Sequence, residues 1–239
     1  MENRLSPEII ISCEHAGNKI PAEYSHLFPE ADDVLSSHRG WDPGALRLAR
    51  DIANHLNTPF FTFEISRLLI EINRSVGHRS LFSEYSSNLP EADKNRLLNF
   101  FYLPYRNSVE EKIKELNRSG KMIIHIGVHT FTPVFKNSTR SCDIGLLYDP
   151  ARGYEKRYCN LLKKSLKQNL PHFKILSNQP YKGADDGLTT YLRNQINETH
   201  YLGIELEVNQ RFLNRKNQFP KEIRKLITHT IGQTLLIPH

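Results

Sequence analysis

The stretch that decides the fold is MIIHIGVH, residues 122–129. This largely apolar run, in which four of the eight residues are β-branched, is typical of a central strand that is buried on both faces of a sheet, and we expect it to end at Thr130. A second such run, residues 9–13, leads into a polar, glycine-containing turn at 14–18. Two buried strands of this kind predict a core built around a sheet.

Shorter strand patterns and helical patterns alternate around these two runs. Further strands are expected at 58–63, 68–72, 144–148, 173–176 and 202–208, and helices at 45–56, 90–117, 153–169, 188–198 and 221–236. Pro104 should kink the 90–117 helix or divide it in two. This alternation predicts an α/β fold with three layers, α/β/α, in which helices cover both faces of a mainly parallel or mixed central sheet. Because composition does not change along the chain, we expect a single α/β domain over residues 1–239.

The composition argues against several classes of protein. With 38% hydrophobic and 24% charged residues, it is that of an ordinary globular chain. No stretch approaches the ~18 apolar residues of a membrane helix. Residues 1–8 hold no apolar signal-peptide core, so we expect a cytoplasmic protein. Three cysteines without a CxxC pair exclude a disulfide framework and argue against a cysteine zinc site.

The net charge of +6 is modest and dispersed along the chain. A protein that binds nucleic acid usually concentrates its basic residues on one face or arm, so this distribution argues against that class. An anionic small-molecule substrate accounts for the same sign. Local motifs of the common nucleotide-binding proteins, esterases and zincins (GxGxxG, GxxxxGK[ST], GxSxG and HExxH) do not occur.

Polar residues gather where the predicted strands end, which is where open α/β sheets bind their ligands. They are Glu14 and His15, Asn73 and Arg74, His129 and Thr130, and Glu205 and Glu207 with the residues after them. Two histidines and a carboxylate form a standard ligand set for a catalytic zinc, and a free carboxylate beside the metal can act as general base. Arg67 and Arg74 are suited to hold a substrate carboxylate through bidentate hydrogen bonds.

Structural explanations compete with these functional ones. Asp42 precedes Pro43 at the start of a predicted helix and is there a normal N-cap. Glu205 and Glu207 point to the same face of their strand, which favours function, although either is suited to pair with an arginine. His125 lies within the apolar strand and is expected in the core. His38, four residues before Asp42, stays undecided.

Five segments together resemble the N-formylglutamate amidohydrolase family. They occur in the order of the family and span roughly residues 9–211: SCEHAGNKIP (12–21), GWDPGA (40–45), SRLLIEINRS (66–75), HTF (129–131) and ELEVN (205–209). The resemblance implies the fold of zinc carboxypeptidases and aspartoacylase-type deacylases, a phosphorylase/hydrolase-like zinc peptidase fold. It also implies a zinc-dependent hydrolysis of the amide of an N-formyl or N-acyl L-amino acid. The substrate implied is N-formyl-L-glutamate, which would yield formate and L-glutamate.

The resemblance also implies roles for individual residues. His15 and His129 correspond to the metal-binding histidines, the Asn73-Arg74 pair to the group that binds the substrate carboxylate, and Arg67 to a further arginine with a substrate-binding and catalytic role. The family's late glutamate, the general base, corresponds to Glu207 better than to Glu205.

The third metal ligand departs from the pattern. Relatives often place a carboxylate three residues after the first histidine, where this chain has Asn18, a poor zinc ligand. Asp42 is the expected replacement for one Zn²⁺ per chain, with Glu14 as the alternative. Two other functions remain as alternatives, a non-catalytic binding or regulatory protein on the same scaffold and a basic domain associated with nucleic acid. The intact set of candidate residues favours the enzyme.

Overall fold

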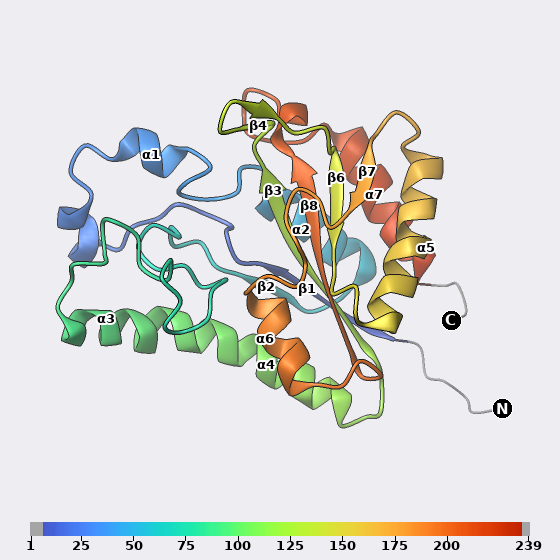
Figure 1. Ribbon diagram of the computed structural model, residues 1–239, viewed down its shortest axis with the longest axis horizontal. Coiled ribbons are helices and arrows are strands. Elements are labelled where there is room, and N and C mark those ends of the chain that lie inside the picture. Colours follow the sequence, from blue (N-terminus) through green and yellow to red (C-terminus); the bar gives the residue numbers. More distant parts are fainter. Residues whose placement is uncertain (1–6, 236–239) are drawn as a thin grey trace.

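The computed structural model describes residues 7–235 and is built on a six-stranded sheet (Figure 1). The strand order is β2-β1-β3-β8-β6-β7. Neighbouring strands are parallel except β6 and β8, which are antiparallel. The strands are β1 (Glu8–Cys13), β2 (Phe60–Thr62), β3 (Ile123–Phe131), β6 (Ile144–Leu147), β7 (Ile175–Ser177) and β8 (Tyr201–Asn209). A separate hairpin joins β4 (Val134–Phe135) and β5 (Ser138–Thr139).

Helices cover both faces of this sheet, as the alternation of strands and helices predicts. On one face lie α2 (Ala45–Leu56), α5 (Gly153–Asn169) and α7 (Lys221–Thr234). On the other lie α4 (Leu103–Asn117) and α6 (Leu188–Gln195). Two short helices, α1 (Asp32–Ser36) and α3 (Glu91–Leu97), lie beyond the sheet's β2 side (Figure 1). The predicted three-layer α/β/α fold with a mainly parallel, mixed sheet is confirmed.

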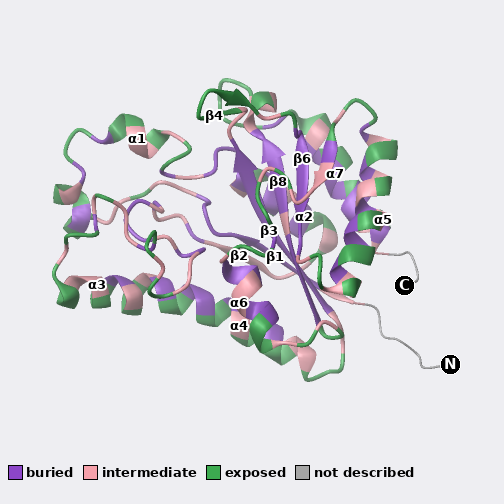
Figure 2. Cartoon of the chain, in the orientation of Figure 1, coloured by how far each residue is buried: buried purple, intermediate pink, exposed green. Residues whose placement is uncertain are grey.

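The two faces of the central strands differ in chemistry. Alternate residues of β1, β3 and β8 form one apolar core: Ile9, Ile11 and Cys13, then Ile124, Ile126 and Val128, then Leu202, Ile204, Leu206 and Val208. The residues between them point to the other face and become polar toward the carboxyl ends. There Gly127 pairs with Glu205, and His129 pairs with Glu207. Both sets are largely buried between the helical layers (Figure 2). A polar stripe thus crosses one face of a buried sheet.

The order of the strands places a ligand site between β1 and β3. From β1 the chain passes through α2 to β2 on one side, and then returns through α3 and α4 to β3 on the other. The two crossovers lie on opposite faces of the sheet. This is a topological switch point, and open α/β sheets bind ligands in the crevice that forms there, beyond the carboxyl ends of the strands.

Two local predictions need correction. Residues 68–72 are not a strand but a series of turns, in which the Leu69 N–H donates to the Ser66 carbonyl at 2.9 Å. Their apolar side chains are buried without sheet pairing, in a second apolar core that lies beneath α4 and α6 on the opposite face of the sheet. The predicted 90–117 helix is divided before Pro104, by a π-helical turn at Leu98–Tyr102. Pro104 then lies in the first turn of α4, where its missing N–H leaves no hydrogen bond broken.

The remaining boundaries agree within a few residues, and the predicted residue 236 lies outside the described range. Within residues 7–235, no helix is both long and apolar enough to cross a membrane.

Ile126→Ala should test the apolar face. Ile126 is 1% exposed in the central strand, and truncation there should lower the free energy of unfolding by about 2–5 kcal/mol. Val76→Ala is the control, because Val76 is 59% exposed and its loss should cost no more than about 0.5 kcal/mol. Urea denaturation of both variants measures the difference. Equal losses would contradict the assignment of the core to this face.

Candidate active site

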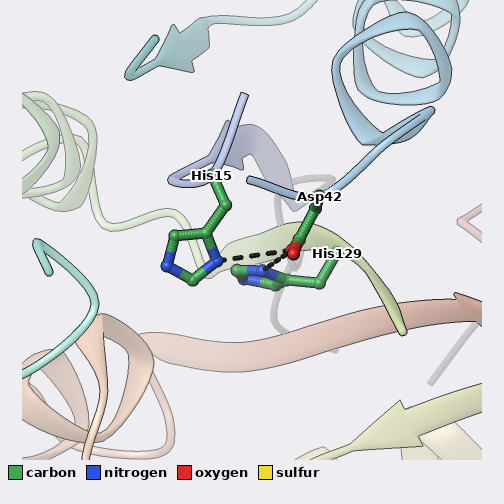
Figure 3. Close-up of side chains that lie close together, drawn as sticks. All are labelled: His15, Asp42 and His129. Atoms are coloured by element: carbon green, nitrogen blue, oxygen red, sulfur yellow. Dashed lines mark hydrogen bonds and ion pairs between the residues drawn. The ribbon is translucent and has the colours of Figure 1, made fainter. Parts of the chain in front are cut away.

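Three buried side chains from distant segments meet at the carboxyl edge of the sheet (Figure 3). His15 lies in the turn directly after β1, His129 lies near the end of β3, and Asp42 precedes α2. The Oδ2 atom of Asp42 lies 3.3 Å from Nδ1 of His15 and 3.0 Å from Nδ1 of His129. One ligand atom from each residue lies within 4.8 Å of the other two. The structure therefore brings together the three residues predicted to bind the metal.

Asp42 is not the N-cap of α2, so this structural explanation of the residue is wrong. Gly44 occupies the cap position with a left-handed φ of 85°. A Cβ atom there would lie 2.6 Å from Cδ2 of Leu213, so both backbone and packing require glycine. Because the helix begins at Ala45, the Asp42 carboxylate is free to face the histidines, and the Asp42 N–H donates to the His15 carbonyl at 3.0 Å.

A further carboxylate lies on the outer nitrogen of each histidine. Oε1 of Glu71 lies 2.6 Å from Nε2 of His15. Oε2 of Glu14 lies 3.1 Å from Nε2 of His129. Glu14, the alternative third ligand, therefore faces the side of His129 away from Asp42. Glu71 was not predicted, although it stands two residues before Asn73 in a segment that the sequence singles out.

These groups form a cluster of buried charges. Burial opposes the ionised form of Asp42, but Arg67 and the two histidines hold the pKa of Asp42 well below its usual range. Burial likewise opposes the charged form of His129, yet Asp42 and Glu14 raise the His129 pKa well above its usual range. Burial opposes the ionised form of Glu71 as well, but the nearby His15 and Arg67 outweigh it and lower the pKa of Glu71 to about 2. The cluster is thus held together by opposite charges on both sides of each imidazole.

Glu207 lies beside this cluster in a different electrostatic state. It is buried, pairs in register with His129, and its Oε2 atom has no hydrogen-bond partner among residues 7–235. Burial, reinforced by the charges of Asp42 and Glu205, raises the pKa of Glu207 to about 8. Glu205 is half-buried and accepts a hydrogen bond from Oγ1 of Thr189 at 3.3 Å. Of the two glutamates, Glu205 accepts a side-chain hydrogen bond, whereas Oε2 of Glu207 has no hydrogen-bond partner among the described residues.

The predicted substrate-binding residues line the same cavity, which has a volume of about 200 Å³. Arg67 pairs with Oδ1 of Asp42, and its buried Nε atom has no hydrogen-bond partner within the described part of the chain. One Nη of Arg74 donates to the Asn73 and Asp186 carbonyls at 2.8 and 2.7 Å, and Asn73 Oδ1 accepts from the Leu188 N–H at 2.7 Å. His38, Thr132, Tyr181 and Lys182 complete much of the lining.

Two residues lie outside this arrangement. The amide of Asn18 donates to the Leu35 carbonyl at 3.0 Å, so it is engaged away from the cluster. His125 lies in the core between Tyr201 and Ser12, as predicted.

The donor set fits a zinc ion. Ligands at about 2.0–2.1 Å from a tetrahedral zinc lie about 3.3 Å from one another, and the two Nδ1–Oδ2 distances here are 3.0 and 3.3 Å. Metal-binding histidines also donate their second N–H group to a carboxylate or carbonyl. Glu71 accepts such a contact from Nε2 of His15, whereas Nε2 of His129 lies 3.1 Å from Glu14 but has no hydrogen-bond partner among the described residues.

A histidine–carboxylate cluster beside a buried glutamate, at the switch point of a mainly parallel sheet, is an arrangement suited to hydrolysis. The chain belongs to the N-formylglutamate amidohydrolase family, whose model matches residues 7–213. It is therefore a hydrolytic enzyme that acts on amides.

Two solved structures are similar over nearly the whole chain. The gene product Atu2144 from Agrobacterium tumefaciens is 27% identical, with a TM-score of 0.81, over 96% of this chain and 90% of that one. The N-formylglutamate amidohydrolase from Ralstonia eutropha JMP134 is 15% identical, with a TM-score of 0.69, over 98% and 93% of the two chains. At 15% identity, the similarity to the Ralstonia eutropha protein shows a shared fold. No curated protein matches the chain.

The raised pKa of Glu207 predicts how the stability of the metal-free protein depends on pH. A carboxyl that binds its proton more tightly when folded adds stability below its ordinary pKa of 4.5 and has lost it once the pH passes about 8. In Glu207→Gln, the free energy of unfolding should therefore fall less between pH 5 and pH 8 than in the unchanged protein. Urea denaturation in the presence of a chelator measures both slopes, and parallel slopes would contradict the raised pKa.

Proposed function

We propose that this enzyme is a zinc-dependent amidohydrolase that cleaves the amide of an N-formyl L-amino acid, N-formyl-L-glutamate in particular, to formate and L-glutamate. The observation that carries the proposal is the contact of His15 and His129 with one oxygen of Asp42, in a cavity that Glu207 also lines. The family supports the choice of the formyl amide.

His15, Asp42 and His129 would hold the metal. A zinc ion bound there would lower the pKa of water and polarise the carbonyl of the scissile amide. The two histidines would offer Nδ1 to the ion, because their Nε2 atoms face Glu71 and Glu14. Asp42 offers Oδ2, while its Oδ1 atom is engaged by Arg67.

Glu207 is the proposed general base. The reaction needs a group that takes a proton from the attacking water and delivers it to the leaving nitrogen. A carboxyl with a pKa near neutrality is suited to both transfers. Burial raises the pKa of Glu207 to about 8 in the metal-free protein, and a cation bound beside it would lower that pKa, so that the ionised base is present at neutral pH. Its unpartnered Oε2 atom is available for the water.

Arginines and an asparagine would bind the substrate. The buried Nε atom of Arg67 is a free donor next to the cluster, suited to stabilise negative charge on the carbonyl oxygen during attack. Arg74 and Asn73 are held in place by backbone contacts at the start of α6 and would bind the α-carboxylate. Lys182 in the lining adds positive charge for an anionic substrate.

His129→Ala tests the metal site. The purified protein should contain one zinc per chain, and loss of one of three ligands should remove both the metal and the activity. His229→Ala is the matched control, because His229 is exposed on α7 and should leave zinc content unchanged. Elemental analysis after dialysis measures the stoichiometry. Normal zinc in His129→Ala would mean that the ligand set is wrong.

Glu207→Gln tests the general base. The amide keeps the shape of the side chain and removes its basicity, so kcat should fall by about 10²–10⁴ while zinc stays bound. Glu205→Gln is the natural comparison, since Glu205 points to the same face two residues earlier and accepts a hydrogen bond from Thr189. A large loss in Glu205→Gln with none in Glu207→Gln would move the assignment to Glu205.

A further inference from the structure

One guanidinium at the rim of the cavity has no carboxylate partner. Arg140 directly follows β5, and its side chain donates to the Thr132 carbonyl at 3.4 Å. Within residues 7–235 no carboxylate lies at ion-pair distance from it. Arg67, by contrast, pairs with Asp42. The positive charge of Arg140 is therefore available to an anion that enters from solvent.

Three aromatic rings hold the Arg140 side chain. Its guanidinium carbon lies 4.7 Å from the ring centre of Phe135, 5.0 Å from that of Tyr181 and 5.6 Å from that of Phe131. A guanidinium that stacks on rings uses its flat faces and keeps the N–H groups along its edges for hydrogen bonds. Phe135 and Tyr181 are 47% and 44% exposed, so these contacts lie at the surface. The arrangement is suited to bidentate binding of a carboxylate.

The backbone on both sides of the guanidinium is fixed as well. The Arg140 N–H donates to the Pro133 carbonyl at 2.8 Å, which continues the pairing of the β4–β5 hairpin. The loop that carries Tyr181 is closed by Asn178, whose Oδ1 atom accepts from the Gly183 N–H at 3.1 Å. A side chain that is already held in place loses little conformational entropy when it binds a ligand.

The contacts of Arg140 connect it to the cavity. Three of the residues that it contacts also line the cavity, namely Phe131, Thr132 and Tyr181. Burial, together with the charges of Arg67 and Arg140, lowers the pKa of His38, which is another lining residue. The charge of Arg140 therefore acts on the space in which a substrate would bind.

A substrate with an acidic side chain carries two carboxylates. The α-carboxylate is assigned above to Asn73 and Arg74, which lie in the turns after β2 and contact the start of α6. Arg140 belongs to the connection that leaves the carboxyl end of β3, on the hairpin beyond the sheet (Figure 1). The two arginines thus come from separate segments around one cavity, and a molecule with two carboxylates has a guanidinium for each.

We propose that Arg140 is a specificity-determining residue that binds the side-chain carboxylate of the substrate, so that the enzyme selects N-formyl derivatives of acidic amino acids over those of neutral ones. This inference rests on the proposed function and deepens it. Lys182 is the rival cation, since it also lines the cavity. Its ammonium is a point charge on an exposed, flexible stem, whereas Arg140 is held by its rings.

Arg140→Met is the direct test. Methionine removes the charge and the donors but still packs against aromatic rings. N-formyl-L-glutamate and N-formyl-L-glutamine have nearly the same shape and differ in charge. The ratio of their kcat/KM values should favour the glutamate derivative in the unchanged protein and fall by about 10–100-fold in the variant, mainly through KM. An equal loss on both substrates would show a merely structural role and overturn the proposal.

Lys136→Met is the matched control. Lys136 lies on the same hairpin, and its ammonium lies 5.5 Å from the ring centre of Phe135, which does not line the cavity. Loss of this exposed charge should leave the ratio nearly unchanged, because salt screens it. Equal falls in Lys136→Met and Arg140→Met would show only a long-range effect of charge. A fall in Lys182→Met with none in Arg140→Met would assign the recognition to Lys182. Both results would overturn the role of Arg140.

Calorimetric titration with L-glutamate and L-glutamine separates this inference from the proposed function. The unchanged protein should bind L-glutamate more tightly, and Arg140→Met should lose that preference. A protein with this preference that cleaves no formyl amide would overturn the proposed reaction and support the role of Arg140. A protein that cleaves formyl amides without the preference would overturn the role of Arg140 alone.

Discussion

The site depends on the burial of one charge, the carboxylate of Asp42. A carboxylate removed from water is stable only when cations or donors surround it, and His15, His129 and Arg67 supply them. Each partner comes from a different segment, so satisfying one group ties the end of β1, the end of β3 and the turns after β2 to the start of α2. The contacts that stabilise the Asp42 carboxylate therefore also hold together the segments at the carboxyl edge of the sheet.

Residues with a local pattern were predictable from the sequence. The sequence shows that apolar residues alternate with residues of the other face along β3 and β8. Parallel pairing of the two strands then places His129 beside Glu207. Asp42 was expected as the replacement for the family carboxylate at position 18, although its local pattern suggested an N-cap. The N-cap suggestion was wrong because Gly44, with its left-handed backbone, occupies the cap position of α2 two residues later.

Residues whose role depends on distant contacts were not predictable. Glu71 stands 56 positions from His15, and no periodicity connects them. The apolar run at 68–72 has the composition of a strand, yet its backbone bonds are local turns and its side chains pack into the second core. Glu14 was noticed as a possible ligand, but only the placement of Tyr105, Ser12 and His129 around it reveals that it faces the other nitrogen.

The antiparallel direction of β6 determines where the chain tolerates changes in sequence and length near the cavity. Because β6 is antiparallel to β8, the chain that leaves β3 at the carboxyl edge enters β6 at that same edge. The connection, with the β4–β5 hairpin and the cavity-lining Thr132, never crosses the sheet. Insertions or deletions there leave both cores untouched, since surface connections tolerate such changes. Selectivity at the cavity mouth is therefore free to evolve separately from the metal-binding edge.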